Sequence, residues 1–224
     1  MNNIWLIGLG GIGKALELTL MESLFNVTVF SSKSKPSFDI TCEKAINAYV
    51  NSVDALPDAV IITTGMLYDD KQMPEKSIVS VDWQWLEKSI KINVLTTLYF
   101  AKAITKRLKR SDNVVFACFS ARVSSISDNR LGGWHSYRMS KSMLNMLIKN
   151  IALEWKIKSP QSIIFGYHPG TVDTFLSKPF QGRVKENQLF TVEQAANYFL
   201  ECLSTRTIEH SGHLFDWQKT EVMP

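Results

Sequence analysis

Tyr137 and Lys141 stand four residues apart in a stretch with the apolar spacing of a helix. On a helix, side chains at this spacing lie on one face, one turn from each other. A nearby ammonium group favours the phenolate form of tyrosine, so it lowers the pKa of the phenol. A tyrosine tuned in this way can exchange a proton with a substrate at neutral pH. The pair therefore indicates acid–base chemistry centred on Tyr137, although the same spacing also occurs on ordinary helix surfaces.

A glycine-rich turn follows a short apolar run near the start of the chain. Residues 4–7 predict a buried strand, and the apolar spacing of residues 14–23 predicts a helix. Between them, glycines let the backbone turn tightly and approach a pyrophosphate, whose charge meets the N-terminus of the helix. The turn therefore predicts nucleotide binding. The candidate contacts are Gly8, Gly10, Gly11, Ile12 and Gly13.

The segment after the second predicted strand, residues 27–30, bears on the choice of cofactor. An NAD site places a carboxylate at this point to bind the ribose hydroxyls. This chain has Ser31, Ser32 and Lys33 instead. Hydroxyl and ammonium groups suit a 2′-phosphate, so the sequence favours NADP(H) over NAD(H), although an ordinary polar loop has the same composition.

Asp39 and Ile40 end a third predicted strand at residues 38–40. An aspartate at this point can accept a hydrogen bond from the amino group of an adenine. The same aspartate can equally cap the helix that is predicted over residues 43–50. The sequence leaves both interpretations open, and Asp39 and Ile40 are kept as candidate cofactor contacts.

Strand and helix patterns alternate along the chain, which predicts an α/β fold. The strands are short and almost continuously apolar, as expected when helices cover both faces of a parallel sheet. We expect one doubly wound Rossmann-fold domain over residues 1–224, with a mostly parallel seven-stranded sheet. The remaining predicted strands are 59–64, 113–119, 162–167 and 212–215, and the remaining predicted helices are 82–109, 136–156 and 191–203. Asp82 is predicted to cap the first of these helices, and Thr191 with Gln194 predicts a capping box at the start of the last.

Three groups of candidate residues come directly after predicted strands. The glycine turn follows the first strand, Ser120 follows strand 113–119, and Pro169 and Gly170 follow strand 162–167. Ligands of doubly wound folds bind beyond the carboxyl ends of the strands. We therefore expect these residues to meet at one edge of the sheet.

The order of these motifs resembles that of the short-chain dehydrogenase/reductase family. The matching residues are the glycine turn, Asp39, Asn93, Ser120, Tyr137 with Lys141, and the run Pro169-Gly170-Thr171-Val172-Asp173-Thr174. Within the family, residues 120–129 and 132–138 are most similar to the group of the C-factor and sniffer-type carbonyl reductases. Three features depart from the family pattern: the glycine turn is one residue shorter, Ile62-Thr63-Thr64-Gly65 replaces the usual Asn-Asn-Ala-Gly, and Leu95-Thr96 follows Asn93-Val94 where a glycine is common.

The resemblance implies a catalytic tetrad. Tyr137 would be the acid and base, and Lys141 would lower its pKa and hold the nicotinamide ribose. Ser120 would bind the substrate oxygen, and Asn93 would hold a water in a proton relay. Ser124 competes with Ser120 because it lies nearer the usual spacing before the tyrosine. We favour Ser120, since it directly follows the strand, and Asn93 can instead be an amide that packs between helices.

The resemblance also implies further contacts to the cofactor, from which the hydride comes. These contacts are Thr64, Gly65, Pro169, Gly170, Val172 and Thr174, together with Tyr137 and Lys141. Residues 175–190 are loop-like and mixed in polarity, so we expect them to form a lid that closes over the substrate. Trp134 and His135 are candidates to line the pocket beneath it.

These observations predict an NADP(H)-dependent oxidoreductase that interconverts a carbonyl and an alcohol in a small molecule. The resemblance permits an alternative, a cofactor-binding signalling or regulatory protein of the C-factor type with little or no turnover. A third hypothesis is a different Rossmann enzyme, such as a methyltransferase, which would leave the Tyr137 and Lys141 pair unused.

Composition argues against several other classes. The net charge is only +4 without a groove-reading motif, so no nucleic-acid partner is expected. No apolar run approaches the roughly 20 residues of a membrane span. The three cysteines are widely spaced, which predicts neither a disulfide framework nor a metal site, and the expected location is the cytoplasm. Family resemblance suggests a homodimer or homotetramer packed through helices 82–109 and 136–156.

Overall fold

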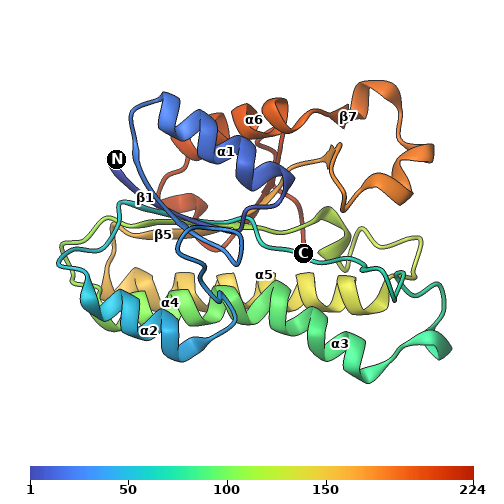
Figure 1. Cartoon of the computed structure of the whole chain (residues 1–224), viewed down its shortest axis with the longest axis horizontal. Coiled ribbons are helices and arrows are strands. Elements are labelled where there is room, and N and C mark those ends of the chain that lie inside the picture. Colours follow the sequence, from blue (N-terminus) through green and yellow to red (C-terminus); the bar gives the residue numbers. More distant parts are fainter.

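One parallel β-sheet lies between two layers of helices in the computed structural model (Figure 1). The structure describes the backbone of residues 1–224 and the side chains of all residues but Arg183 and Glu186. The strands pair in the order β2-β1-β3-β4-β5-β8, and each neighbouring pair is parallel. They are β1 Asn3–Ile7, β2 Asn26–Phe30, β3 Ala59–Ile62, β4 Val115–Phe119, β5 Ile163–His168 and β8 Leu214–Asp216.

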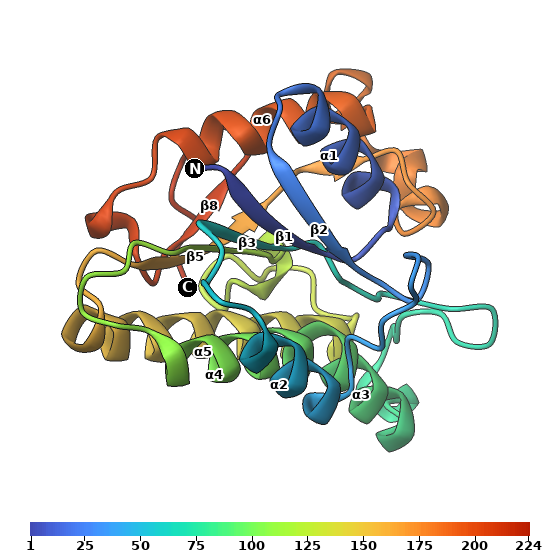
Figure 2. The ribbon, with the colours of Figure 1, turned by 60° about the vertical axis from the view of Figure 1, so that its left-hand side comes forward.

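Helices cover both faces of this sheet, as Figure 2 shows. The helices α1 (Gly11–Glu22) and α6 (Val192–Ser204) lie on one face. The helices on the other face are α2 (Glu43–Ser52), α3 (Trp83–Ile90), α4 (Thr96–Arg107) and α5 (His135–Lys158). The strand order runs outward from β1 in both directions, so the predicted doubly wound α/β fold is confirmed.

The buried strands feed two separate cores because their side chains alternate between the faces of the sheet. In β1, Trp5 and Ile7 pack into the core beneath α4 and α5, whereas Ile4 and Leu6 pack into the core beneath α1 and α6. Both faces are therefore apolar, which explains why the strand sequences read as continuous hydrophobic runs.

The sheet has six strands and not seven, because residues 38–40 do not pair as a strand. The chain turns back at this point, and the backbone N–H of Phe38 donates to the carbonyl of Ser31 at 2.9 Å. Phe38 and Ile40 still pack against the core. The apolar residues at 38–40 therefore indicated burial and not a strand, since a loop can bury such side chains as well.

The helix predicted over residues 82–109 is interrupted. Asp82 caps its start as predicted, accepting from the backbone N–H of Trp85 at 2.8 Å. A π-helical turn at Lys91–Leu95 then separates α3 from α4, and Asn93 lies within this turn. Such turns occur frequently at functional sites. Asn93 and Val94 are the buried residues of this turn.

The lid region forms a second, smaller β-ladder beside the main sheet. Strand β6 (Thr171–Val172) pairs with β7 (Leu189–Phe190) in parallel, and short 3-10 turns connect them. The predicted capping box at the start of α6 is confirmed, because Thr191 and Gln194 bond reciprocally. Within the described residues, no helix combines the length and apolar character needed to cross a membrane.

Candidate active site

The glycine turn between β1 and α1 has a backbone that side chains would obstruct. Gly8 has a φ of +102°, and its N–H donates to the carbonyl of Phe30 at 2.9 Å. A Cβ on Gly13 would lie 2.2 Å from the carbonyl oxygen of Gly8. The hydroxyl of Thr63 donates to the same oxygen at 3.0 Å. Thr63, which stands where the family pattern has a polar amide, therefore ties the end of β3 to this turn.

A cavity of about 570 Å³ opens above this turn. Gly10 offers no side chain to cap α1, so the first N–H groups of the helix stay available to a ligand. A Cβ on Gly10 would meet nothing within 4 Å. Lys14 and Lys33 also line the cavity. An open cradle, free N–H groups and two ammonium groups together suit the phosphates of a dinucleotide.

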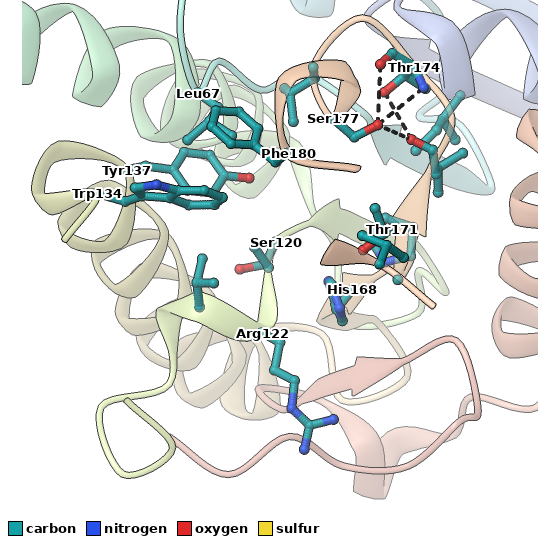
Figure 3. Close-up of a pocket in the computed structure, with 18 residues that line it drawn as sticks. Leu67, Ser120, Arg122, Trp134, Tyr137, His168, Thr171, Thr174, Ser177 and Phe180 are labelled. Carbon is teal, nitrogen blue, oxygen red and sulfur yellow. Dashed lines mark hydrogen bonds between the residues drawn. The ribbon is translucent and has the colours of Figure 1, made fainter. Parts of the chain in front are cut away.

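A second cavity of about 340 Å³ adjoins the first and contains Tyr137 and Ser120 (Figure 3). Ile12, Thr174 and Leu176 line both cavities, so they mark the boundary between them. The walls of the second cavity are mainly apolar. Among the described residues, the apolar side chains include Leu67, Val123, Trp134, Leu176, Phe180 and Val184.

Tyr137 and Lys141 lie in the first turns of α5, as predicted, and both are buried. Burial raises the pKa of Tyr137, which is the opposite of the direction predicted from the spacing. Lys141 Nζ lies 5.9 Å from the centroid of the Tyr137 ring and donates to the carbonyl of Phe119 at 2.8 Å. Burial lowers the pKa of Lys141 to about 8. Burial therefore favours the protonated phenol of Tyr137.

Asn93 is buried and uses its side chain to join two segments. Its Nδ2 donates to the carbonyl of Met66 at 3.0 Å and to Ser140 Oγ at 2.9 Å. Its Oδ1 accepts from the backbone N–H of Met66 at 2.7 Å. A Cβ on Gly65 would lie 3.4 Å from Lys141 Nζ and 3.7 Å from Asn93 Oδ1. The π-helical turn thus brings Asn93, Gly65 and Lys141 together, and the hydrogen bonds of the amide tie this turn to Met66 and Ser140.

The two candidate serines occupy different places. Ser120 lies just beyond β4 and lines the cavity that contains Tyr137. Ser124 is buried and lines a different cavity, between α5 and β8. Its hydroxyl donates to the carbonyl of Ala121 at 2.5 Å. The geometry therefore favours Ser120 as the serine that can reach a substrate.

The residues predicted to follow strand 162–167, which the structure has as β5, also line the cavity of Tyr137. They are Pro169, Gly170, Val172 and Thr174. Gly170 has a φ of +76°, and a Cβ there would lie 2.7 Å from the ring of Phe190. A Cβ on Gly11 would lie 2.7 Å from the Thr174 side chain, so the glycine turn and the lid base meet closely.

The residues predicted to contact the adenosine end of the cofactor do not all line the larger cavity. Lys33 is exposed and lines the larger cavity, whereas Ser31 is buried and accepts from the backbone N–H of Lys33 at 3.1 Å. Asp39 accepts from the N–H and hydroxyl of Thr41, and these bonds hold the pKa of its carboxyl below the ordinary value.

Some of these predicted residues lie away from the described walls of both cavities. They are Gly8, Ser31, Ser32, Asp39, Ile40, Thr64, Asn93 and Lys141. Helix capping was one of the two interpretations of Asp39, but α2 begins after Cys42 without any side-chain cap. The Thr64 hydroxyl donates to the carbonyl of Ile7 at 3.3 Å, so it supports the glycine turn from behind.

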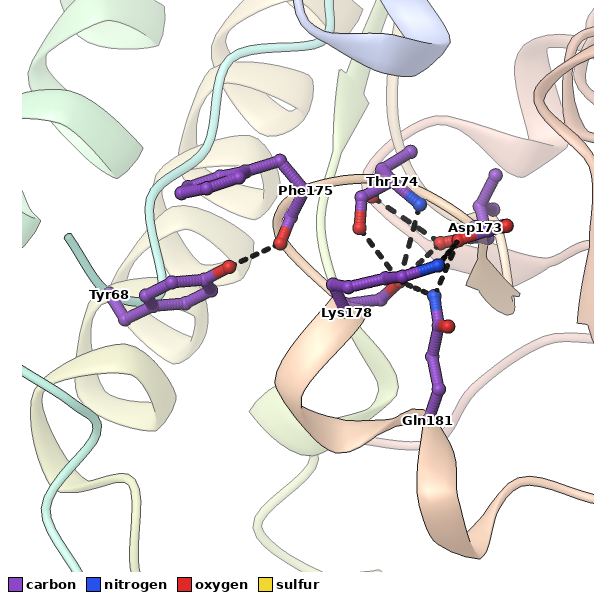
Figure 4. Close-up of polar contacts among 8 residues, drawn as sticks. Tyr68, Asp173, Thr174, Phe175, Lys178 and Gln181 are labelled. Carbon is purple, nitrogen blue, oxygen red and sulfur yellow. Dashed lines mark hydrogen bonds and ion pairs between the residues drawn. The ribbon is translucent and has the colours of Figure 1, made fainter. Parts of the chain in front are cut away.

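The lid is held against the cavity by aromatic contacts. The Tyr68 hydroxyl donates to the carbonyl of Phe175, and the two rings stack with their centroids 5.1 Å apart (Figure 4). The Phe180 ring lies 4.7 Å from that of Trp134 and 5.9 Å from that of Tyr68. At the base of the lid, Gln181 donates to Asp173 Oδ1 at 2.8 Å. The segment therefore closes one side of the cavity.

Several residues at the site were not singled out from the sequence. Glu75 is buried beside the start of α5, and Tyr68 anchors the lid. His168 ends β5 and lines the cavity, and its burial, with nearby Arg122, lowers its pKa to about 4. Asn145 bonds to Ser120. The position of Asn145, eight residues after Tyr137 on one helix, was the only available signal.

Two known proteins are similar to this chain in sequence. No family model matches the chain. The chain is 30% identical over 181 residues to 1-hydroxy-2-glutathionyl-2-methyl-3-butene dehydrogenase of Rhodococcus sp. (strain AD45), covering 80% of this chain and 74% of that protein. It is 28% identical over 142 residues to C-signal of Myxococcus xanthus, covering 63% and 80%.

A solved structure shares the fold. The NADPH-bound carbonyl reductase from chicken fatty liver superposes with a TM-score of 0.82 at 19% identity, covering 100% of this chain and 99% of that one. The fold, the glycine turn and the relatives define an NAD(P)-dependent oxidoreductase. The chain belongs to the short-chain dehydrogenase/reductase family.

Proposed function

We propose that this protein interconverts a carbonyl and an alcohol with NADP(H), using Tyr137 as the acid and base. One observation carries the proposal: Tyr137 and Ser120 line a mainly apolar cavity that adjoins the cavity above the glycine turn. A dinucleotide spanning both cavities would bring its reactive end to these two side chains. The hydride itself is supplied by the nicotinamide.

The residues of the larger cavity fit such a cofactor. The N-terminus of α1 and the space above Gly10 suit the pyrophosphate, and Lys33 suits a 2′-phosphate. Among the described residues that line this cavity there is no carboxylate to bind ribose hydroxyls. This supports NADP(H) over NAD(H), and we keep Ser31, Ser32, Asp39 and Ile40 as candidate contacts near the adenosine.

The roles of the side chains follow from their protonation and burial. Tyr137 is protonated at neutral pH, as an ordinary phenol is, and burial raises its pKa further, so it can deliver a proton to the oxygen of a carbonyl as the hydride arrives. Ser120 would hold that oxygen by a hydrogen bond, which strengthens as charge develops. Lys141 would hold the ribose and compensate the phenolate that remains. Asn93 fixes the chain beside Lys141, and we retain it as the holder of a water.

The substrate proposal rests on the walls of the smaller cavity. Trp134 and Phe180 face it with aromatic rings, and Leu67 adds an aliphatic wall. Such walls bind apolar groups by removing them from water. We therefore propose a small carbonyl compound with an apolar or aromatic substituent.

NADPH consumption with a panel of aldehydes and ketones tests this function. We expect turnover of apolar aldehydes by the wild-type protein. Ser120→Ala should lose more activity than Ser124→Ala, because only Ser120 lines the cavity of Tyr137. Absence of turnover across the panel, with NADPH still bound, would instead favour a signalling or regulatory role, an alternative that the similarity to C-signal supports.

Assembly and location are further proposals. The exposed face of α5 carries Met139, Met143 and Met146, which an ordinary monomer surface would not concentrate on one helix. We propose that a homodimer or homotetramer covers this face, together with α4. The three free cysteines agree with a reducing compartment such as the cytoplasm.

A further inference from the structure

Asn145 links the serine of the active site to the interior of the molecule. It lies on α5, eight residues after Tyr137, and is half-buried. Its Oδ1 accepts a hydrogen bond from Ser120 Oγ at 2.7 Å. Its Nδ2 donates to Ser124 Oγ at 2.6 Å. One amide therefore contacts both serines of the segment that follows β4.

The orientation of this amide is determined by the next group in the chain of hydrogen bonds. Ser124 donates its hydroxyl hydrogen to the carbonyl of Ala121 at 2.5 Å. Its oxygen can then only accept from Asn145, so the NH₂ end of the amide must face Ser124. The carbonyl end must face Ser120. This order leaves a single consistent direction for all three bonds.

The consequence concerns the position of Ser120 Oγ. A serine side chain has three staggered rotamers, and a surface serine exchanges among them freely. The acceptor at 2.7 Å selects the rotamer that turns the Ser120 hydroxyl toward Asn145. In that rotamer the oxygen stays at the wall of the cavity that holds Tyr137 (Figure 3).

We propose that Asn145 is a positioning residue that holds Ser120 Oγ in one rotamer, with Ser124 fixing the orientation of the amide. When a substrate binds, the single hydroxyl hydrogen of Ser120 turns from Asn145 to the substrate oxygen, while Oγ keeps its place at the cavity wall. The proposal rests on the carbonyl–alcohol chemistry proposed above. It also gives the two serines different tasks: Ser120 contacts the substrate, and Ser124 acts two hydrogen bonds away.

A double-mutant cycle tests the proposal. Asn145→Leu removes the acceptor at similar volume, and we expect kcat for aldehyde reduction to fall roughly 10-fold to 100-fold, as for other misplaced catalytic groups. The affinity for NADPH should stay unchanged. In a Ser120→Ala background the same substitution should change the residual kcat by less than about twofold, because its effect passes through Ser120. Equal losses in both backgrounds would overturn the proposal, as would a wild-type kcat for Asn145→Leu.

Ser142→Ala is the matched control. Ser142 lines the same inner cavity, and its hydroxyl donates to the carbonyl of Ser124 at 2.7 Å, but no described contact joins it to Ser120. We expect its kcat to stay near that of the wild type. A loss equal to that of Asn145→Leu would show that any disturbance of this cavity lowers kcat, and would overturn the specific role of Asn145.

A structural readout keeps the test independent of turnover. Crystal structures of the wild type and of Asn145→Leu should show one Ser120 rotamer in the first and several in the second. Asn145→Asp, which keeps an acceptor for Ser120, should restore the single rotamer and replaces the leucine variant if that variant does not fold. A single unchanged rotamer in Asn145→Leu would contradict the proposal. If the wild type reduces no carbonyl, the proposed function fails, whereas the rotamer result still decides the positioning role.

Discussion

At the scale of the residue, the least expected feature is the protonation of the Tyr137 and Lys141 pair. Both groups are buried, and burial disfavours the charged form of each. It raises the pKa of the phenol and lowers the pKa of the amine to about 8. The spacing of the two residues predicts only the attraction between a phenolate and an ammonium. Desolvation, which the spacing does not reveal, has the larger effect on both pKa values.

The burial of Lys141 predicts a pH dependence of stability. Its pKa is lowered from 10.5 to about 8, so between these values the unfolded chain binds more protons than the folded protein. A rise in pH through this window therefore favours folding. We expect the unfolding free energy of the wild type, minus that of Lys141→Met, to rise by about 1.4 kcal/mol per pH unit there and to be flat below it.

Urea unfolding of both proteins across this range measures the difference. Lys149→Met removes an exposed lysine from the same helix and reports the effect of the substitution itself. A difference between wild type and Lys141→Met that is constant from neutral pH upward would contradict the burial of a titrating amine at this position.

Lys33 provides a second prediction at this scale, on cofactor choice. Its ammonium lines the larger cavity, where a 2′-phosphate is proposed to bind. A hydrogen bond to a charged group contributes about 1.5–3 kcal/mol, so Lys33→Glu should weaken NADPH binding by about tenfold or more. The affinity for NADH should change little, since it lacks this phosphate. Fluorescence titration with both dinucleotides measures the two affinities.

Lys35→Glu is the control for Lys33→Glu. Lys35 carries the same charge two residues away and is exposed, but it is not among the described residues that line the cavity. An equal loss of NADPH affinity in both variants would indicate a general effect of charge and would remove Lys33 from the site.

At the scale of the element, the start of α5 depends on a carboxylate from a distant loop. Trp134 precedes the helix with a φ of 52° and provides no side-chain cap. Glu75 replaces that cap: it is buried, and it accepts from the Ser136 N–H at 3.2 and 3.3 Å and from the Ser136 hydroxyl. A negative charge at a helix N-terminus is favourable. Glu75 therefore holds the turn that carries Tyr137.

Removing this anchor should destabilise the protein. We expect Glu75→Leu to lower the unfolding free energy by about 1–3 kcal/mol, because buried N–H and hydroxyl groups lose their acceptor. Glu75→Gln keeps one acceptor oxygen and should lose less. Thermal and urea unfolding provide the measurement, and Glu154→Leu on the exposed face of α5 is the control. Equal stability of Glu75→Leu and the wild type would contradict the anchoring role.

The elements differ in how well the sequence predicted them. Strands β1 and β3 and helix α6 were placed because long apolar runs and a capping box are local signals. The strand expected at residues 38–40 is a loop, because three residues cannot distinguish burial in a strand from burial in a turn. The π-helical turn around Asn93 was missed because one added residue leaves the apolar stripe nearly unchanged.

The residues of the candidate site were also predicted only in part. The order of motifs placed Ser120, Tyr137 and Pro169 at one cavity, because parallel strands bring their carboxyl ends to one edge. Glu75, Tyr68 and Asn145 could not be predicted from the sequence. Each acts through a hydrogen bond to a residue that is far away along the chain. Such contacts leave no periodic pattern.

At the scale of the whole molecule, the exposed methionines of α5 predict association. Met139, Met143 and Met146 are exposed by 43%, 44% and 62%, and their spacing places them on one helix face. We expect light scattering after gel filtration to give a mass of at least two chains for the wild type. Met143→Glu should give monomers, because a charge would be buried without a partner.

Met73→Glu is the control for association, since Met73 is similarly exposed but lies in the loop before α3 and not on the exposed face of α5. A wild-type protein that is monomeric at high concentration would contradict the prediction. So would a Met143→Glu protein with unchanged mass, because the apolar face would then lie outside any interface.

The whole account depends on proton transfer by the phenol of Tyr137. This side chain lines the smaller cavity, which adjoins the cavity above the glycine turn. The most direct measurement is the rate of NADPH oxidation with the best aldehyde of the panel, for the wild type and for Tyr137→Phe at saturating cofactor. General acid catalysis contributes roughly 100-fold to 10,000-fold, so we predict a loss of that size with NADPH affinity unchanged. A Tyr137→Phe protein that oxidises NADPH at the wild-type rate would contradict the account.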